Sequence, residues 1–195
     1  MAVTFYSSED AGAPQWRSSG LTAGTNNIIE ILDAVLLTGY GSKPGCGWSK
    51  VASSTINDRT VYRNQSAHQN DMHLLVQSHP STNYVCMMQA ADSVVSPEEY
   101  YGYSAVACCG QNYGINRWIA IGDERTIVFA VANNNMNSSH YYVYGPSYIY
   151  AGDFDPQGND HPSAWGVVSN TMFQGTLDTG YNGYGCGVLR NIGSQ

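Results

Sequence analysis

One segment of the chain has the apolar period of an amphipathic helix. Its apolar residues recur at helical spacing along one face: Ile28, Ile31, Leu32, Val35 and Leu36. Asn27 precedes them as the N-cap, Glu30 completes a capping-box-like pair, and Gly39 follows the last turn. We therefore expect one helix over residues 27–38, with its apolar face packed on a sheet.

Most of the other apolar residues occur in short runs rich in β-formers. These runs are 61–63, 72–77, 84–89, 104–108, 117–121, 126–132, 140–144, 147–151 and 186–189. The short polar Gly/Asp loop at 122–125 joins two of them and indicates a hairpin. We expect an α+β, mostly β fold: an antiparallel β-sandwich or open barrel with one N-terminal amphipathic helix packed on it.

The two ends of the chain are poor in such patterns. Residues 7–25 are rich in Ser, Gly and Ala, and the chain after about residue 153 is dominated by Gly, Asp, Asn, Pro and Ser. We expect residues 1–25 to form an extended N-terminal arm and residues 26–195 a single β-rich domain with Gly/Asn-rich C-terminal loops. Arms of this kind gain order by lying across a neighbouring subunit, where they add to a sheet edge.

The composition of the chain limits the classes of partner that we expect it to bind. The chain has 195 residues, only 12% of them charged, and a formal net charge of −7. Nucleic acids and anionic membranes bind clustered cations, so we expect neither as a partner. The N-terminus lacks a basic start and an apolar stretch, and no apolar run approaches the ~18 residues of a bilayer span, so we expect neither a signal peptide nor a membrane segment.

The cysteines indicate the compartment of synthesis. There are five, Cys46, Cys86, Cys108, Cys109 and Cys186, without a C-x-x-C pair. An odd count without such spacing is atypical of a disulfide-stapled secreted domain. We expect reduced thiols in a protein made in a cytoplasm.

No sequence motif points to an enzyme. The chain contains no H-E-x-x-H, G-x-S-x-G, phosphate-binding loop or dinucleotide-binding fingerprint. We therefore expect no catalytic residues and no cofactor. One segment, 153–160, imitates the start of a calcium loop, but Gln157 occupies the fifth position and Ala164 the twelfth. We interpret it as a polar turn, with Asp153 and Asp155 as weak candidates for an irregular cation site and no metal expected.

Tyrosine is abundant, with 15 residues, and tyrosines alternate along two predicted strands. Tyr142 and Tyr144 share one strand face, and Tyr148 and Tyr150 share another. Tyrosine offers a large contact area at low entropic cost, which suits interfaces. Core packing and a sugar-stacking platform are the alternatives. The predicted interface residues are Phe5, Tyr6, Trp16, Tyr142, Tyr144, Tyr148 and Tyr150.

Several short motifs resemble, in their order, a poorly characterised group of structural proteins of tailed bacteriophages. They are Gly12-Ala13-Pro14, ILDAVLLTGYGSKP at 31–44, Gly47-Trp48-Ser49-Lys50, Val61-Tyr62-Arg63, Trp118 ahead of Gly122-Asp123-Glu124-Arg125, and Tyr150-Ala151-Gly152-Asp153-Phe154. The resemblance covers residues 10–156. The Asn-rich segment 133–139 and the Cys108-Cys109 pair have no counterpart in that pattern.

The resemblance implies a virion component made in the host cytoplasm. We expect head decoration, a head–tail junction or a tail component that contacts copies of itself and other virion proteins. The alternative is a receptor- or glycan-binding module at the tail tip. No enzymatic residues are implied.

Overall fold

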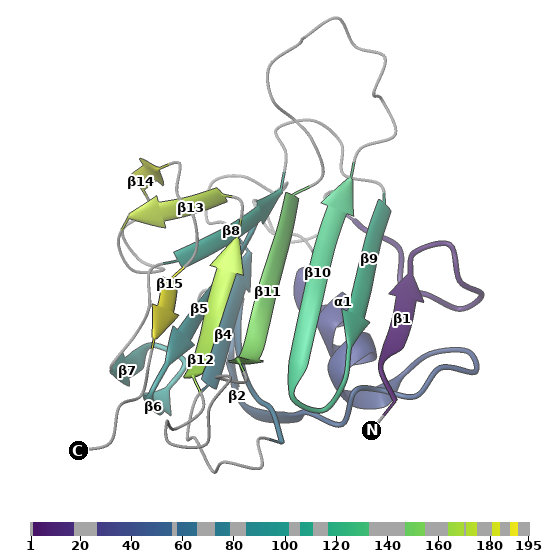
Figure 1. Cartoon of the computed structure of the whole chain (residues 1–195), viewed down its shortest axis with the longest axis horizontal. Helices are drawn as coiled ribbons and strands as arrows, with labels where there is room; N and C mark the ends of the chain where they lie inside the picture. The colour runs from purple at the N-terminus through teal and green to yellow at the C-terminus, as the bar shows by residue number, and fades with distance from the viewer. Residues whose placement is uncertain are drawn as a thin grey trace, which may run out of the picture.

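The computed structural model describes residues 2–17, 27–55, 58–65, 73–78, 85–101, 106–110, 117–132, 147–154, 164–169, 171–174, 181–183 and 188–190. They form two large antiparallel sheets, a small two-stranded sheet and one helical segment. The two large sheets lie one behind the other as the layers of a sandwich (Figure 1). This confirms the predicted mostly β fold with one helix.

The first sheet has six strands, and every described pairing within it is antiparallel. Its order is β1 (Thr4–Ser7), β9 (Arg117–Gly122), β10 (Thr126–Ala132), β11 (Ser147–Phe154), β12 (Ala164–Ser169) and β15 (Val188–Arg190). Strands β9 and β10 form the predicted hairpin, with Ile127 opposite Gly122. The Asp123 carboxylate accepts hydrogen bonds from the backbone N–H groups of Arg125 and Thr126, both at 2.8 Å, which closes the turn.

The second sheet has seven strands and faces the first. Its order is β14 (Tyr181–Gly183), β13 (Thr171–Gln174), β8 (Val106–Gly110), β5 (Val85–Ala91), β4 (His73–Ser78), β3 (Arg59–Arg63) and β2 (Ser49–Ser54). The hairpin of β6 (Ser93–Ser96) and β7 (Glu99–Tyr101) forms the small third sheet. Strands β12, β13 and β14 were not predicted within the Gly/Asn-rich C-terminal region, whereas β15 overlaps the predicted run 186–189. Their short runs of β-formers, such as those in AWGVVS and TMFQ, are surrounded by turn-forming residues, and cross-strand pairing shows them as strands.

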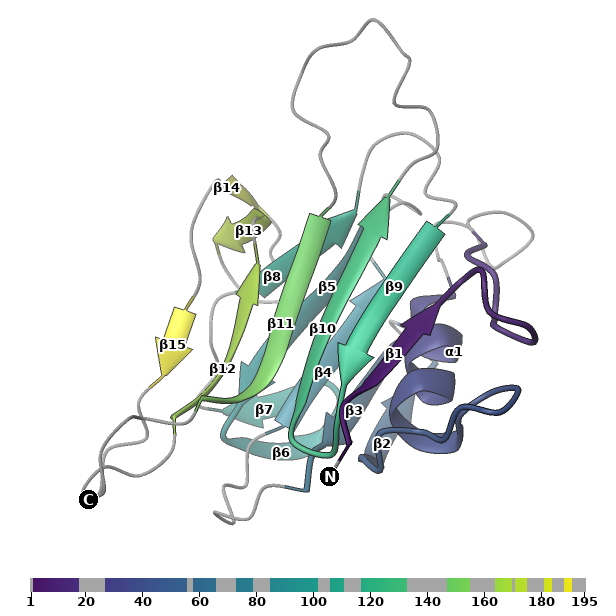
Figure 2. The ribbon, with the colours of Figure 1, turned by 45° about the vertical axis from the view of Figure 1, so that its right-hand side comes forward.

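The helical segment lies at one end of the sandwich, beside β1 and β2 (Figure 2). It begins as α1 (Ile28–Leu32) and continues as a π-helical stretch, η1 (Asp33–Thr38). The predicted apolar face is confirmed, because all five of its residues are fully buried: Ile28, Ile31, Leu32, Val35 and Leu36. No segment within the described residues combines the length and apolarity that a helix needs to cross a membrane.

The predicted capping box at the start of this helix does not form. Asn27 makes no side-chain cap. Its Oδ1 instead accepts a hydrogen bond from the Arg17 backbone N–H at 2.7 Å, and its Nδ2 donates to the Gln15 carbonyl at 2.8 Å. The Asn27 side chain thus attaches the N-terminal segment to the helix.

The helix ends at Gly39, as predicted. Gly39 follows the last turn with φ 75°, and a Cβ there would lie 2.2 Å from the Lys43 carbonyl oxygen, so only glycine fits.

The main core fills the space between the helix and the inner faces of the two large sheets. Trp118 and Phe129 from the six-stranded sheet stack with ring centroids 6.2 Å apart. Tyr62, Leu74 and Met88 reach the same core from the seven-stranded sheet. The core therefore joins residues from the whole described length of the chain before β12.

The predicted N-terminal arm is wrong for the described residues 2–17. Residues 4–7 form β1, which pairs with β9 of the same chain, and Ser8 donates its backbone N–H to the Trp118 carbonyl at 2.9 Å. Tyr6 and Trp16 are buried in the main core. The physical reason is that β1 bonds the backbone groups at the edge of β9, while Tyr6 and Trp16 bury large aromatic side chains in the core of the same chain.

Candidate interaction face

On β1, β9, β10 and β11, the outward side of the six-stranded sheet is largely apolar. Along β9, residues alternate strictly between exposed and buried positions, with Ile119 and Ile121 exposed and Trp118 and Ala120 buried. This alternation follows from the two-residue period of a strand. Figure 1 shows no described element in front of β9, β10 and β11, so their outward residues form a surface that the described chain leaves uncovered.

The strand register places these outward residues in two rows. In the first row Phe5 lies opposite Ile121, which lies opposite Val128, which lies opposite Tyr150. In the second row Ser7, Ile119, Ala130 and Tyr148 are aligned in the same way, and Ser7 is a polar residue that is already buried at the edge of this row. The exposed fractions are 50% for Phe5, 42% for Ile119, 41% for Ile121 and 46% for Tyr148. We call these eight residues the outer face. Cross-strand neighbours lie about 5 Å apart, so the surface is continuous over four strands.

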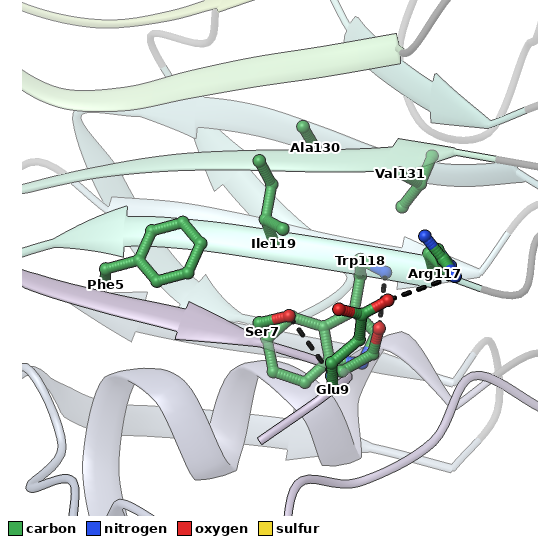
Figure 3. A pocket seen from close by; sticks show the side chains of 9 residues that line it. Phe5, Ser7, Glu9, Arg117, Trp118, Ile119, Ala130 and Val131 are labelled. Atoms are coloured by element: carbon green, nitrogen blue, oxygen red, sulfur yellow. Dashed lines mark hydrogen bonds and ion pairs between the residues drawn. The ribbon is translucent and has the colours of Figure 1, made fainter.

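A hollow of about 300 Å³ lies at one corner of the outer face. Phe5 and Ile119 line its apolar part, and Ser7, Glu9 and Arg117 line its polar part (Figure 3). Glu9 and Arg117 form an ion pair at 3.1 Å, with both side chains more than half exposed. The hollow thus combines apolar walls with one neutralised pair of charges.

The structure brings together three of the predicted interface residues and separates the others. Phe5, Tyr148 and Tyr150 lie on the outer face, on β1 and β11, although more than 140 residues separate Phe5 from Tyr148 in the sequence. Tyr6 and Trp16 were predicted as interface anchors, and this is wrong because both are core residues. Tyr142 and Tyr144 lie outside the described residues.

Sequence analysis did not identify the central residues of the outer face. These are Ile119, Ile121, Val128 and Ala130 on the β9–β10 hairpin. A signal was present, because exposed Ile119 and Ile121 alternate with buried Trp118 and Ala120. However, the inward and the outward residues of β9 are both apolar, so the pattern could not show which face of the strand is buried.

The outer surface of the seven-stranded sheet, on the opposite side of the sandwich, is partly covered by a hairpin of the same chain. On the seven-stranded sheet a second buried apolar cluster contains Val61, Leu75, Met87, Ala91 and Tyr100. Tyr100 comes from β7, so the β6–β7 hairpin covers this cluster. Buried Arg59 supports the cover by donating to the Pro97 carbonyl at 2.7 Å. Within the described residues, the chain covers the apolar outer surface of the seven-stranded sheet and leaves that of β9, β10 and β11 exposed.

Asp153, the weak cation candidate, serves a structural purpose instead. Its carboxylate accepts a hydrogen bond from Arg125 Nε at 2.9 Å and another from Asn64 Nδ2 at 3.1 Å, and its side chain is only 2% exposed. Asp155 lies outside the described residues. Among the side chains that the structure describes, no three of His, Cys, Asp or Glu are grouped so that they could hold a metal ion.

Three of the motifs that carry the phage resemblance, those at 47–50, 122–125 and 150–154, meet at the β9–β10 turn. Trp48 Nε1 donates to the Asp123 carbonyl at 2.9 Å, and Asn64 Nδ2 donates to the Arg125 carbonyl at 2.7 Å. Arg125 then pairs with Asp153. We call these five residues the hairpin junction. It connects the two sheets, because Trp48 precedes β2 and Asn64 follows β3 of the seven-stranded sheet, whereas Asp123, Arg125 and Asp153 belong to the β9–β10 turn and β11 of the six-stranded sheet. Four motif residues, joined by Asn64, therefore hold the two sheets together here.

A second junction fixes the N-terminal segment to the loop after the helix. Asp10 Oδ2 accepts hydrogen bonds from Lys43 Nζ at 2.5 Å and from Tyr40 Oη at 2.8 Å. The bond from Lys43 is the main reason that the pKa of Asp10 lies below its ordinary value. Trp118 Nε1 donates to the Pro14 carbonyl at 2.8 Å. Burial raises the pKa of Tyr6 and of Tyr40, so both phenols stay protonated.

On the outer face, Tyr150 has a perturbed titration. Burial, followed by the nearby Asp153 charge, raises the pKa of Tyr150 to about 12. Its hydroxyl donates to the Asp153 carbonyl. The ring therefore has a fixed orientation on the face, with its polar tip already bonded within the chain. The outer face therefore presents aromatic and aliphatic side chains to the solvent.

The chain matches no protein-family model, no curated protein and no solved structure.

Proposed function

We propose that this chain is a structural component of a tailed-bacteriophage virion and that it acts by multivalent protein–protein contacts. The observation that carries the proposal is the outer face, where two rows that are apolar except for Ser7 run across four strands and Phe5, Ile119, Ile121 and Tyr148 are about half exposed. Exposed apolar patches of this kind on a folded domain mark contact surfaces. The chain would occupy the head surface, the head–tail junction or the tail.

Two further features support the phage assignment. The ordered motifs resemble those of tailed-phage structural proteins, and in this chain residues of these motifs supply most of the hairpin junction, together with Asn64, and the partners of Asp10 in the second junction. Related structural proteins whose surface residues have diverged would still share the motifs that stabilise their common sandwich. The low content of charged residues, 12%, also suits a protein that buries much of its surface in an assembly.

The proposal is tested on particles released from cells that encode the chain. Particles are purified on a density gradient, and the chain is quantified by mass spectrometry against a capsid protein. We expect the chain in the particles at dozens to hundreds of copies, as repeated symmetric assembly requires. Particles without the chain would overturn the proposal.

A receptor- or glycan-binding tip module is the second candidate, and the hollow favours it. Its apolar wall at Phe5 and its polar groups on Ser7, Glu9 and Arg117 could accept a small polar ligand. About three to twelve copies per particle would favour this candidate over the structural one. Binding of a host glycan that the variant Phe5→Ala loses would assign the hollow directly.

A further inference from the structure

We infer that the outer face is occupied by a second copy of this chain, packed sheet against sheet in a two-fold symmetric dimer. This inference rests on the proposed function, since it names the partner of the same surface. The face is largely apolar and continuous over four strands, and in an isologous contact the same residues serve on both sides. Three observations support this occupant.

The first observation is charge. The chain carries a formal net charge of −7, so most surfaces of two copies repel each other. Among the outward-pointing described residues of β1, β9, β10 and β11, Arg117 carries the one charge, and Glu9 just beyond β1 pairs with it at 3.1 Å. The outer face is thus neutral. Two copies that meet through it bring no like charges together.

The second observation is size. Strands lie about 4.8 Å apart and rise about 3.4 Å per residue, so the 25 residues of β1, β9, β10 and β11 span on the order of 400 Å². A stable protein–protein contact buries about 800 Å² on each partner. The face has about half of that area, so it fits a weak dimer that additional contacts in an assembly would strengthen.

The third observation is shape. Outward residues of medium size, Ile119, Ile121 and Val128, occupy the centre, with the larger Phe5 and Tyr148 at the sides. Sheets pack face to face about 10 Å apart when such side chains interdigitate. The same chain already makes this kind of packing between its own two large sheets. The dimer would repeat it on the outside.

The test uses sedimentation velocity of the full chain from about 1 µM to about 200 µM. The variant Ile121→Arg places a charge at the centre of the face. Val95→Arg is the matched control, because Val95 is an exposed β-strand valine on the β6–β7 hairpin, which forms the small third sheet away from the outer face. We expect concentration-dependent dimers for the wild type and for Val95→Arg. We expect monomers at every concentration for Ile121→Arg, with an unchanged Tm.

A wild-type chain that stays monomeric at the highest concentration would overturn the inference, and so would a dimer that Ile121→Arg leaves intact. If Ile121→Arg does not fold, Tyr148→Arg at the side of the same face replaces it. Incorporation of the variants into particles separates this inference from the proposed function. If the wild type is monomeric but Ile121→Arg is lost from particles, the face is used in assembly and only the second copy as its partner is rejected. If Ile121→Arg is monomeric but enters particles normally, the dimer stands and only the role of this face in assembly is rejected.

Discussion

Arg125 Nε donates to Asp153 Oδ2 across 2.9 Å, and this ion pair connects the β9–β10 turn to β11. Asp153 is almost fully buried, whereas a third of the Arg125 side chain remains exposed. Gly152, directly before Asp153, has φ 140°, and a Cβ there would lie 2.5 Å from the Arg125 carbonyl oxygen. The two backbones approach closely because glycine allows it, and the ion pair then forms across this contact.

Replacing Asp153 should destabilise the protein strongly. In Asp153→Ala, Asn64 and Arg125 lose their carboxylate partner inside the hairpin junction, at a cost of about 2–4 kcal/mol in the free energy of unfolding. The matched control is Glu9→Ala, which removes the exposed ion pair with Arg117 and should cost less than about 1 kcal/mol. Urea unfolding of both variants measures the difference. Equal effects would contradict the structural role of Asp153.

Neighbouring residues of β1 should differ sharply in their contribution to stability. Tyr6 is fully buried and Phe5 is half exposed, because they point to opposite faces of the same strand. Tyr6→Ala should cost about 3–5 kcal/mol, as expected for a large buried side chain, and Phe5→Ala less than about 1 kcal/mol. Thermal unfolding of the two variants tests this. A mild effect of Tyr6→Ala would restore the idea of an N-terminal segment that packs outside its own domain.

The helix should depend on its buried face. Leu32→Ala opens a cavity between the helix and the sheets and should cost about 2–4 kcal/mol. Leu37, a half-buried leucine of the same helical segment, serves as the matched control. Leu37→Ala should cost about half as much. Circular dichroism during urea unfolding gives both values, and a larger effect at Leu37 would argue against the helix orientation.

The bond between Asp10 and Lys43 should make stability depend on pH in the acid range. The folded-state pKa of Asp10 lies below its ordinary value of 3.8, so its contribution is fully present above about pH 4. It is lost as the pH falls through the lower folded-state pKa. The wild type should therefore exceed Asp10→Asn in stability at neutral pH, and the difference should shrink toward pH 2. Glu9→Gln is the control for loss of a neighbouring acidic charge. A difference that grows in acid would contradict this assignment.

All five cysteines should react with a maleimide in the denatured, nonreduced chain, because we expect a protein made in a reducing compartment. Cys46 is buried and burial raises the pKa of its thiol, so it should react slowly before denaturation. A count of three labels would instead indicate one disulfide. Cys86 and Cys109 would then be the first pair to test, because β5 and β8 align them as Cα partners.

The sequence by itself was sufficient for the local elements. The helix was predictable because its apolar spacing reports a local 3.6-residue period, and all five residues of that pattern are buried. The β9–β10 hairpin was predictable because a short turn joins two strands that pair with each other. Low charge and abundant tyrosine indicated contact surfaces, and three of the seven predicted interface residues share the outer face.

Only the tertiary structure decided which segments pair over long distances and which faces are covered. β1 has four residues, too few to show a period, and its partner β9 lies more than 100 residues away. Whether Phe5 or Tyr6 is exposed depends on which side of β9 meets the helix. From the sequence, Asp153 likewise belonged to a polar surface turn. In the folded chain it is buried, because Arg125 and Asn64, which come from the two different sheets, bond its carboxylate. Alternation along a strand is local, but burial is a property of the assembled layers.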